Sequence, residues 1–318
     1  MAALEAAYPS VSAALRCPAC RFPLIRNDEG LGCTSTACGK TFPEVGGIPI
    51  LINEANSVFR IGEIAAMGIR EASARSFWDR ALPRLTANPV SETNYRRLAE
   101  TLNSGGSGAR VLVIGGARGG VGMKPLYQSP HLELIETDVV ASTNTRYVCD
   151  GHDLPFEKET FDAIVLQAVL EHVIDPSRVV AEAHRVLKPN GLVYAETPFM
   201  QQVHAAAFDF TRFTDLGHRR LFRYFEEIER GVACGPASAL AWSFQHFLIA
   251  FSSGPRSRKL LTAFARLSVF WLKYFDYWLV RRKVAHDGAS SLYFFGRKHS
   301  RAIDDRRLLE LYRGAPAS

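Results

Sequence analysis

The stretch that decides the fold is Phe161-Asp-Ala-Ile-Val-Leu166, followed by the segment 176–187 and then by Gly191-Leu-Val-Tyr-Ala-Glu-Thr197. The first and last segments are short apolar runs of the kind that form buried strands. The middle segment has the apolar spacing of an amphipathic helix and is followed by the turn Lys188-Pro-Asn-Gly191. A strand, a helix and another strand in this order predict a parallel α/β sheet.

Three more predicted strands precede this stretch. The first of them runs directly into the glycine-rich turn Gly115-Gly-Ala-Arg-Gly-Gly120. Asp138 closes the second, 19 residues after Gly119, and an acid in this place accepts the ribose hydroxyls of an adenosine. A strand, a glycine turn and an acid at this distance therefore predict a nucleotide-type site. The three strands are 111–114, 131–138 and 146–150.

Several linked motifs carry a family resemblance. They are D-G-x-D-L-P-F from Asp150, F-D-A-I-V from Phe161, V-L-E-H-V from Val169 and R-V-L-K-P-N-G-L from Arg185. Together they resemble the class I S-adenosylmethionine-dependent methyltransferases, and within them the ubiquinone-biosynthesis-type group, over residues 108 to 200. The resemblance implies a doubly wound, Rossmann-like methyltransferase sheet closed by an antiparallel seventh strand, for which the segment 291–297 is the candidate. It implies S-adenosylmethionine as the cofactor.

The resemblance also implies the residues of a cofactor site. Gly115 and Gly119 match the turn that packs against the methionine part of the cofactor. Val113 and Ala117 stand where the family usually has an acid and its middle glycine, which predicts a weaker hold on the amino-acid end. The other matches are Asp138 as the ribose acid, Asp150 as the acid at the adenine amino group, Gly151 and His152 beside the ring, and Gln167 near the methionyl end.

Three side chains are candidate catalytic groups. Methyl transfer to a hydroxyl needs alignment of the reacting atoms and benefits from a general base. His172 follows the fourth strand, and His204 and Asp209 lie in the loop after the fifth. The alternatives are that His172 satisfies a helix end, that His204 is solvated and that Asp209 pairs with Arg212. The segment from Phe208 resembles one in methyltransferases of polysaccharide and glycolipid biosynthesis, which implies a sugar-type acceptor.

Four cysteines near the N-terminus have the spacing of a metal site. Cys17, Cys20, Cys33 and Cys38 form the pattern C-x2-C-x12-C-x4-C. Two short loops that each supply a cysteine pair predict a zinc ribbon, and four thiolates leave no open position, so the zinc is structural. Residues 15–52 resemble the small zinc-ribbon proteins that activate tRNA and protein methyltransferases, except that the second pair is wider.

The carboxyl third contains a long insertion between the sixth and seventh predicted strands. Residues 252–318 hold 14 Lys/Arg and 5 Asp/Glu, whereas the first 251 residues have a net charge of −3. The segment 259–283 is expected to be helical, with Lys259, Arg266 and Lys273 on one face beside many aromatic residues. Two interpretations stay open: packing on the core or on a second subunit in a homodimer, and peripheral contact with a membrane. Nucleic acid is not an expected partner.

The compartment is inferred from two observations. The N-terminus shows neither a basic start nor an apolar core of signal-peptide length, and the cysteines do not form the dispersed framework of a small secreted domain. A cytoplasmic protein with reduced thiols is expected, with peripheral contact to the inner face of the membrane as the variant. No run of 18 uncharged apolar residues exists.

These observations give one expected organisation and function. A ribbon at 14–55 and a helical connector at 56–107 precede a methyltransferase domain at 108–300 with a helical insertion at 236–288, and a tail spans 301–318. The expected activity is O-methylation of a sugar, glycolipid or other small-molecule hydroxyl. A tRNA or protein methyltransferase and a non-catalytic scaffold are the alternatives. A base-amine acceptor is disfavoured because Gln167-Ala-Val-Leu170 replaces the asparagine-proline-proline-tyrosine type motif.

Overall fold

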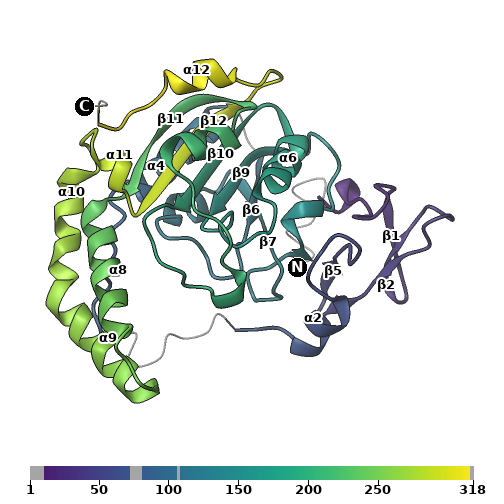
Figure 1. Cartoon of the computed structure of the whole chain (residues 1–318). Helices are drawn as coiled ribbons and strands as arrows, with labels where there is room; N and C mark the ends of the chain where they lie inside the picture. Colours follow the sequence, from purple (N-terminus) through teal and green to yellow (C-terminus); the bar gives the residue numbers. More distant parts are fainter. Residues whose placement is uncertain (1–10, 72–80, 106–107, 316–318) are drawn as a thin grey trace.

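A nine-stranded mixed sheet runs through the centre of the computed structural model, which describes residues 11–71, 81–105 and 108–315 (Figure 1). The strand order is β11-β12-β10-β9-β6-β7-β8-β5-β4, and β12 is antiparallel to both of its neighbours. The expected doubly wound, Rossmann-like sheet with an antiparallel seventh strand is therefore confirmed. Its strands are β4 (Glu44–Val45), β5 (Ile48–Leu51), β6 (Ala109–Ile114), β7 (Leu132–Asp138), β8 (Tyr147–Cys149), β9 (Phe161–Gln167), β10 (Leu187–Pro198), β11 (Phe225–Cys234) and β12 (Ser291–Lys298).

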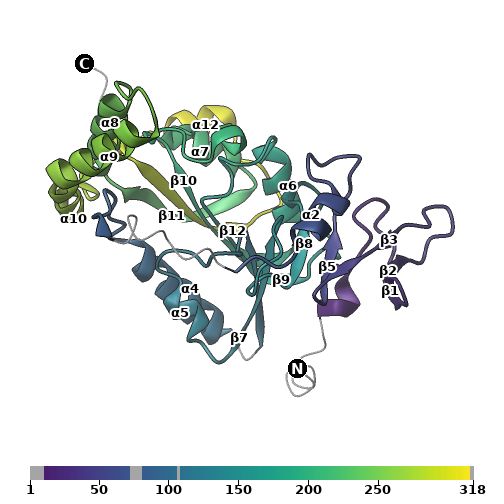
Figure 2. The same ribbon diagram turned by 90° about the horizontal axis from the view of Figure 1, so that it is seen from below.

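Helices cover both faces of this sheet because successive side chains of a strand point to opposite faces. Leu112 and Ile114 of β6 join the core that contains Val179 of α6 (Pro176–Val186). Val111 and Val113 join the core on the other face, with Leu98 of α4 (Ser91–Ser104). Figure 2 shows the two helices on opposite sides of the sheet. The remaining short helices around the sheet are α5 (Lys124–Tyr127), α7 (Asp215–Leu221), α12 (Asp305–Leu309) and the 3₁₀ turns η2 (Gly151–Asp153) and η3 (Ala206–Phe208).

The N-terminal lobe begins with η1 (Val11–Ala14) and a small antiparallel sheet of β1 (Leu24–Asn27), β2 (Gly30–Cys33) and β3 (Thr41–Phe42). Buried side chains of this lobe, among them Leu31 and Phe42, belong to the same core as α6. Arg21 donates to the carbonyl oxygen of Leu154 at 2.7 Å and forms an ion pair with Glu182 at 3.0 Å. The lobe is therefore anchored to the sheet domain by both packing and charge.

The last part of the predicted ribbon range belongs to the central sheet. Strand β5 runs parallel to β8, with Ile50 opposite Val148 and Leu51 opposite Cys149, and β4 pairs with β5 on the outside. The range 14–55 predicted as a ribbon thus divides between a small sheet of its own and two strands added to the edge of the large one.

The predicted helical connector 56–107 is only partly helical where it is described. It contains α2 (Ile61–Met67) and α4, while residues 81–90 lack a long helix. Residues 72–80 and 106–107 lie outside the described ranges, as do residues 1–10, on which the prediction about the N-terminus falls.

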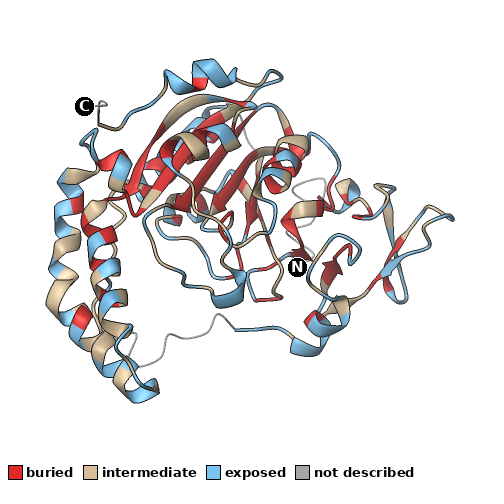
Figure 3. Ribbon diagram, viewed as in Figure 1, coloured by how far each residue is buried: buried red, intermediate tan, exposed pale blue. Residues whose placement is uncertain are grey.

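The insertion between β11 and β12 is helical, as expected. It comprises α8 (Pro236–Ile249), α9 (Pro255–Val269), the 3₁₀ helix η4 (Phe270–Phe275), α10 (Asp276–Leu279) and α11 (Ala285–Gly288). Helices α8 and α9 lie side by side at the end of the molecule opposite the N-terminal lobe (Figure 1). The sheet is mostly buried, whereas much of the insertion 236–288, called the helical hairpin below, is exposed (Figure 3). Within the described part of the chain, none of the helices has the length and apolar character that crossing a membrane requires.

Candidate functional site

A cavity of about 970 Å³ opens where strands β6, β7, β9 and β10 end. Ligands of open α/β sheets bind at these carboxyl ends. The cavity lining contains five of the residues that the sequence analysis singled out, which come from four different loops or strand ends. These are Gly115, Gly119, Asp138, Gln167 and His204.

The glycine turn borders this cavity in a backbone conformation that favours glycine. Gly115 has φ +77° and Gly119 has φ +65°, which places both in the left-handed region. A Cβ on Gly115 would also lie 2.4 Å from Cγ2 of Val169. The turn therefore needs glycine at position 115 for two reasons, and its backbone borders the cavity.

Asp138 ends β7 at the same wall. Its Oδ2 accepts from the backbone N–H of Ala117 and its Oδ1 from that of Val140, both at 3.1 Å. Burial raises the pKa of this carboxyl, and the backbone donors oppose that effect. The carboxylate is oriented by the glycine turn, and each oxygen keeps acceptor capacity for a ribose hydroxyl.

Gln167 forms the floor of the cavity at the end of β9. Its Nε2 donates to the carbonyl of Val121 at 3.0 Å and to Oε2 of Glu196 at 2.9 Å, and Oγ of Ser91 lies 3.2 Å from the same nitrogen. Glu196 also accepts from Tyr194 at 2.5 Å, and burial raises its pKa. The Oε1 atom of Gln167 is buried and has no hydrogen-bond partner among the described residues. This acceptor is therefore available to a donor on a bound ligand.

Asp150, Gly151 and His152 lie outside the lining of this cavity. Oδ2 of Asp150 accepts from Oγ of Ser57 at 2.5 Å, and its Oδ1 lies 2.5 Å from Nδ1 of His152. Burial raises the pKa of Asp150, but the hydrogen bonds from His152 and Ser57 outweigh burial and leave the pKa lowered. The adenine role of these residues stays a prediction, and Ser57 of the connector is a partner that the sequence did not indicate.

The three candidate catalytic residues lie in one cluster. The rings of His172 and His204 are 5.0 Å apart in an edge-to-face arrangement. Asp209 forms a two-point ion pair with Arg212 and accepts from the backbone N–H of His204 at 2.8 Å. The guanidinium of Arg212 lowers the pKa of Asp209 well below its usual range, so Asp209 is a poor proton acceptor and instead holds the loop.

Glu171 joins this cluster and was missed from the sequence. Its carboxylate is 1% exposed, and Oε1 lies 3.6 Å from Nε2 of His172. Burial raises the pKa of Glu171 to about 7 and lowers that of His172. Its place next to His172, four residues after the strand β9 that ends at the cavity, was the signal available in the sequence.

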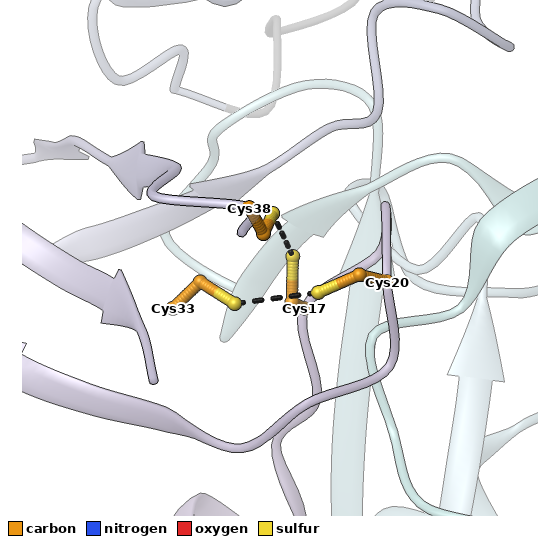
Figure 4. A group of neighbouring side chains, drawn as sticks. All are labelled: Cys17, Cys20, Cys33 and Cys38. Atoms are coloured by element: carbon orange, nitrogen blue, oxygen red, sulfur yellow. Dashed lines mark hydrogen bonds between the residues drawn. The ribbon is translucent and has the colours of Figure 1, made fainter. Parts of the chain in front are cut away.

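A second cluster consists of the four N-terminal cysteines (Figure 4). The sulfur atoms of Cys17 and Cys38 are 3.8 Å apart and those of Cys20 and Cys33 are 3.3 Å apart. Tetrahedral zinc with Zn–S bonds of about 2.3 Å places sulfur atoms roughly 3.8 Å apart. All four are free thiols, and no other ligand type joins the group among the described residues. The donor set therefore fits a closed, four-thiolate metal site.

Comparison with known proteins finds similarity to methyltransferases. Residues 128–195 match the methyltransferase domain family. Over 44 residues the chain is 50% identical to the ubiquinone/menaquinone biosynthesis C-methyltransferase UbiE of Desulfotalea psychrophila, which covers 14% of this chain and 18% of that protein. Over 105 residues it is 29% identical to the demethylmenaquinone methyltransferase of Lysinibacillus sphaericus, and this match covers 33% of this chain and 35% of that protein. The chain thus spans 35% or less of the length of these two relatives.

Among solved structures, the chain is similar to phosphoethanolamine N-methyltransferase 2 of Haemonchus contortus, with 16% identity and a TM-score of 0.41 over 65% of this chain and 53% of that one. The strand order is that of a class I, Rossmann-like methyltransferase fold, and the stretch that matches the methyltransferase domain family lies within this sheet. In this chain the domain has a four-cysteine lobe attached at the β8 edge and a helical hairpin inserted between β11 and β12.

Proposed function

We propose that the chain is an S-adenosylmethionine-dependent methyltransferase that methylates a hydroxyl of a sugar, a glycolipid or another small molecule. The supporting observation is the cavity whose lining includes the glycine turn, Asp138, Glu171 and His204. Its volume of about 970 Å³ is near the upper end of the range for ligand pockets, roughly 300–1,000 Å³. Such a volume suits an acceptor beside the cofactor.

The residues present fit the cofactor. Asp138 would hold the ribose hydroxyls, the glycine turn would pack against the methionine part, and Oε1 of Gln167 would accept from a donor near it. The cofactor supplies an already activated methyl group when bound. The protein then has to align the acceptor oxygen, exclude water and accept the proton that this oxygen loses. Glu171 and His204, which line the cavity, and the neighbouring His172 would supply groups for that proton.

Replacing Asp138 with alanine is expected to weaken S-adenosylmethionine binding by about 1.5–3 kcal/mol, because hydrogen bonds to a charged group are lost. Isothermal calorimetry measures the change. Glu133→Gln is the matched control, since Glu133 lies on the same strand but pairs with Arg146 at 2.8 Å and does not line the cavity. Equal affinities of wild type and Asp138→Ala would contradict the assignment of Asp138 to the ribose and make Glu136 the candidate for that contact.

The acceptor class is tested by transfer of a labelled methyl group into fractions of a cell extract. Label in the glycan or lipid fraction supports the proposal, whereas label in RNA or protein supports the alternative that the ribbon resemblance favours. A folded chain that does not bind S-adenosylmethionine would contradict both methyltransferase interpretations and favour the non-catalytic scaffold.

We further propose that Cys17, Cys20, Cys33 and Cys38 hold one structural zinc. The sulfur distances and the all-thiolate donor set support it. The zinc would fix the lobe whose β5 strand extends the central sheet, in a role resembling that of the small activator ribbons but within one chain.

We also propose that the helical hairpin contacts an anionic membrane surface. Arg266 donates to Gln245 of α8 and Lys273 donates to the carbonyl of Arg84, so these two basic residues face the protein. The outer stripe, which faces solvent, is apolar, and its members are spaced three or four residues apart and are 49–72% exposed. They are Leu260, Phe264, Leu267, Trp271, Tyr274 and Trp278.

Charge favours lipid as the occupant of the outer stripe. Residues 236–283 contain eight Lys/Arg and one acid, Asp276, which is 0% exposed. Exposed basic groups follow the stripe at Arg281, Arg282 and Lys283, and Arg282 stacks over the ring of Trp278 at 4.2 Å. An aromatic face with basic residues at its end suits the interface of an anionic bilayer.

Replacing Arg281, Arg282 and Lys283 with glutamine is expected to reduce sedimentation with anionic vesicles at least severalfold, because each basic group near the surface contributes about 1 kcal/mol. Arg301, Arg306 and Arg307, which are exposed on and near α12, provide a charge-matched control triple. Tryptophan fluorescence should report insertion in the wild type. Failure of the wild type to bind anionic vesicles, with a dimer in analytical ultracentrifugation, would instead support the homodimer.

A further inference from the structure

Two histidines and one carboxylate meet at the edge of the cavity, away from the cysteine cluster. One ligand atom of each of Glu171, His172 and His204 lies within 4.8 Å of the others. Glu171 and His172 come from the loop after β9, and His204 comes from the loop after β10. We propose that these three side chains bind one divalent transition-metal ion, in addition to the zinc of the ribbon.

The donor set suits a first-row transition ion. Imidazole nitrogen and carboxylate oxygen are common ligands of Mn²⁺, Fe²⁺, Co²⁺, Ni²⁺ and Zn²⁺. Metal–ligand bonds of about 2.0–2.2 Å bring neighbouring ligand atoms to roughly 3.0–3.5 Å of one another. Nε2 of His172 and Oε1 of Glu171 are already 3.6 Å apart, and the ligand atom of His204 lies within 4.8 Å of both. Binding therefore needs little movement of the first pair and an approach of His204, which lies in a loop.

Both histidines are oriented by their second ring nitrogen. Nδ1 of His172 lies 2.7 Å from the carbonyl oxygen of Phe208. Nδ1 of His204 lies 3.2 Å from the carbonyl of Gln202 and 3.4 Å from Oδ2 of Asp209. Donation from Nδ1 to these oxygens leaves Nε2 of each ring as the lone-pair nitrogen, which is how protein metal sites fix a histidine ligand. The Asp209 that was expected to be catalytic is in this way a positioning residue.

The carboxylate of Glu171 independently indicates a missing cation. Both of its oxygens are buried and have no hydrogen-bond partner among the described residues. The neighbouring cation Arg212 is committed elsewhere, because its guanidinium donates to Asp209 and to the carbonyls of Gln201 and Gln202. A buried carboxylate is normally paired or bound to a metal, and an ion in the cluster would provide that partner.

The location suggests what the ion does. Glu171 and His204 line the cavity together with Gln167, so three protein ligands would leave coordination positions open toward the acceptor. This role rests on the proposed function. An acceptor hydroxyl bound to the ion would lose its proton more easily, and with the three ligand side chains occupied by the ion that proton would pass to solvent water. The oxygen would then take the methyl group from the sulfonium, whose sulfur keeps the electron pair of the broken C–S bond and becomes a neutral thioether.

The test is Mn²⁺ binding by the full, zinc-loaded chain. The electron paramagnetic resonance signal of free Mn²⁺ measures how much of the ion stays unbound. Wild type should bind about one Mn²⁺ per chain, and Glu171→Gln and His204→Gln should each weaken binding more than tenfold. Asp209→Asn should weaken it less, as expected for a residue that acts through a ligand. His184→Gln is the control, because the Nε2 of this half-buried histidine lies 2.9 Å from the carbonyl of His299, outside the cluster.

Two outcomes would overturn the proposal: no Mn²⁺, Co²⁺ or Zn²⁺ bound beyond the ribbon zinc, or binding that both ligand variants leave unchanged. His204→Gln guards against a folding artefact, because its side chain lies in a loop and is 26% exposed. Calorimetry with S-adenosylmethionine on the same samples tests the proposed function separately. A chain that binds Mn²⁺ but not the cofactor would keep the metal site and reject the methyltransferase role.

Discussion

Replacing Cys17 with serine is expected to unfold the N-terminal lobe and to release most of the bound zinc. Cys17 is fully buried, and its sulfur lies 3.8 Å from that of Cys38. A lobe this small has little core of its own, so metal binding supplies much of its folding energy, about 10–16 kcal/mol in zinc-finger peptides. Metal analysis and hydrogen exchange over residues 15–52 measure the loss.

The matched control is Cys149→Ser, which changes a buried free thiol outside the cluster. This variant should keep about one zinc per chain, and in Cys17→Ser the central strands of the sheet should remain protected from exchange. Wild-type protein that carries no zinc when undamaged, or Cys17→Ser protein that keeps its zinc and its protection, would remove the basis for a structural metal.

Replacing Asp276 with alanine is expected to lower the free energy of unfolding of the helical hairpin by about 3–5 kcal/mol. The carboxylate of Asp276 is 0% exposed. It accepts from the backbone N–H of Ala237 at 3.0 Å and from the backbone N–H and hydroxyl of Ser238 at 2.9 and 2.6 Å. The substitution leaves these buried donors at the start of α8 without a partner and removes a negative charge that the helix N-terminus favours.

Urea unfolding and hydrogen exchange of α8 measure this effect. Asp305→Ala is the control, because Asp305 is exposed on α12 and its contacts with Arg220 and Arg223 are 3.5 and 3.6 Å long. Surface pairs of that kind contribute little. Similar losses in the two variants would show that the buried hydrogen bonds of Asp276 do not hold the hairpin together.

Local sequence patterns predicted the central sheet well. The segment 161–166 was expected as a strand and β9 is Phe161–Gln167, and the helix expected at 176–187 is α6, Pro176–Val186. Both signals are local: an apolar run in one case and the apolar spacing of an amphipathic helix in the other. In the structure this helix is capped by Asp175, whose side chain accepts from the N–H of Arg178. The places of Asp138 and Gln167 at the cavity follow because strand ends in such a sheet share one edge.

Features that depend on distant contacts could not be predicted in this way. The short apolar run Ile48–Leu51 indicates a strand but does not say that its neighbour is β8, about 100 residues later. The hydrogen bond from Ser57 to Asp150 depends on the path of the connector. Glu171 resembles any acid after a strand, and only the three-dimensional packing shows that its carboxylate lacks a partner.

The addition of β5 and β4 to the sheet also bears on aggregation. An open strand edge is a template for pairing with another chain, and proteins avoid this with short or covered edge strands. Here the β8 edge is covered, and the new edge, β4, is only two residues long. At the other end, Arg313 donates to the carbonyl of Arg230 in β11 and pairs with Glu227, so the C-terminal tail lies over that edge. A chain whose lobe has lost its zinc would expose the β8 edge, and we expect aggregation of such a chain to begin there.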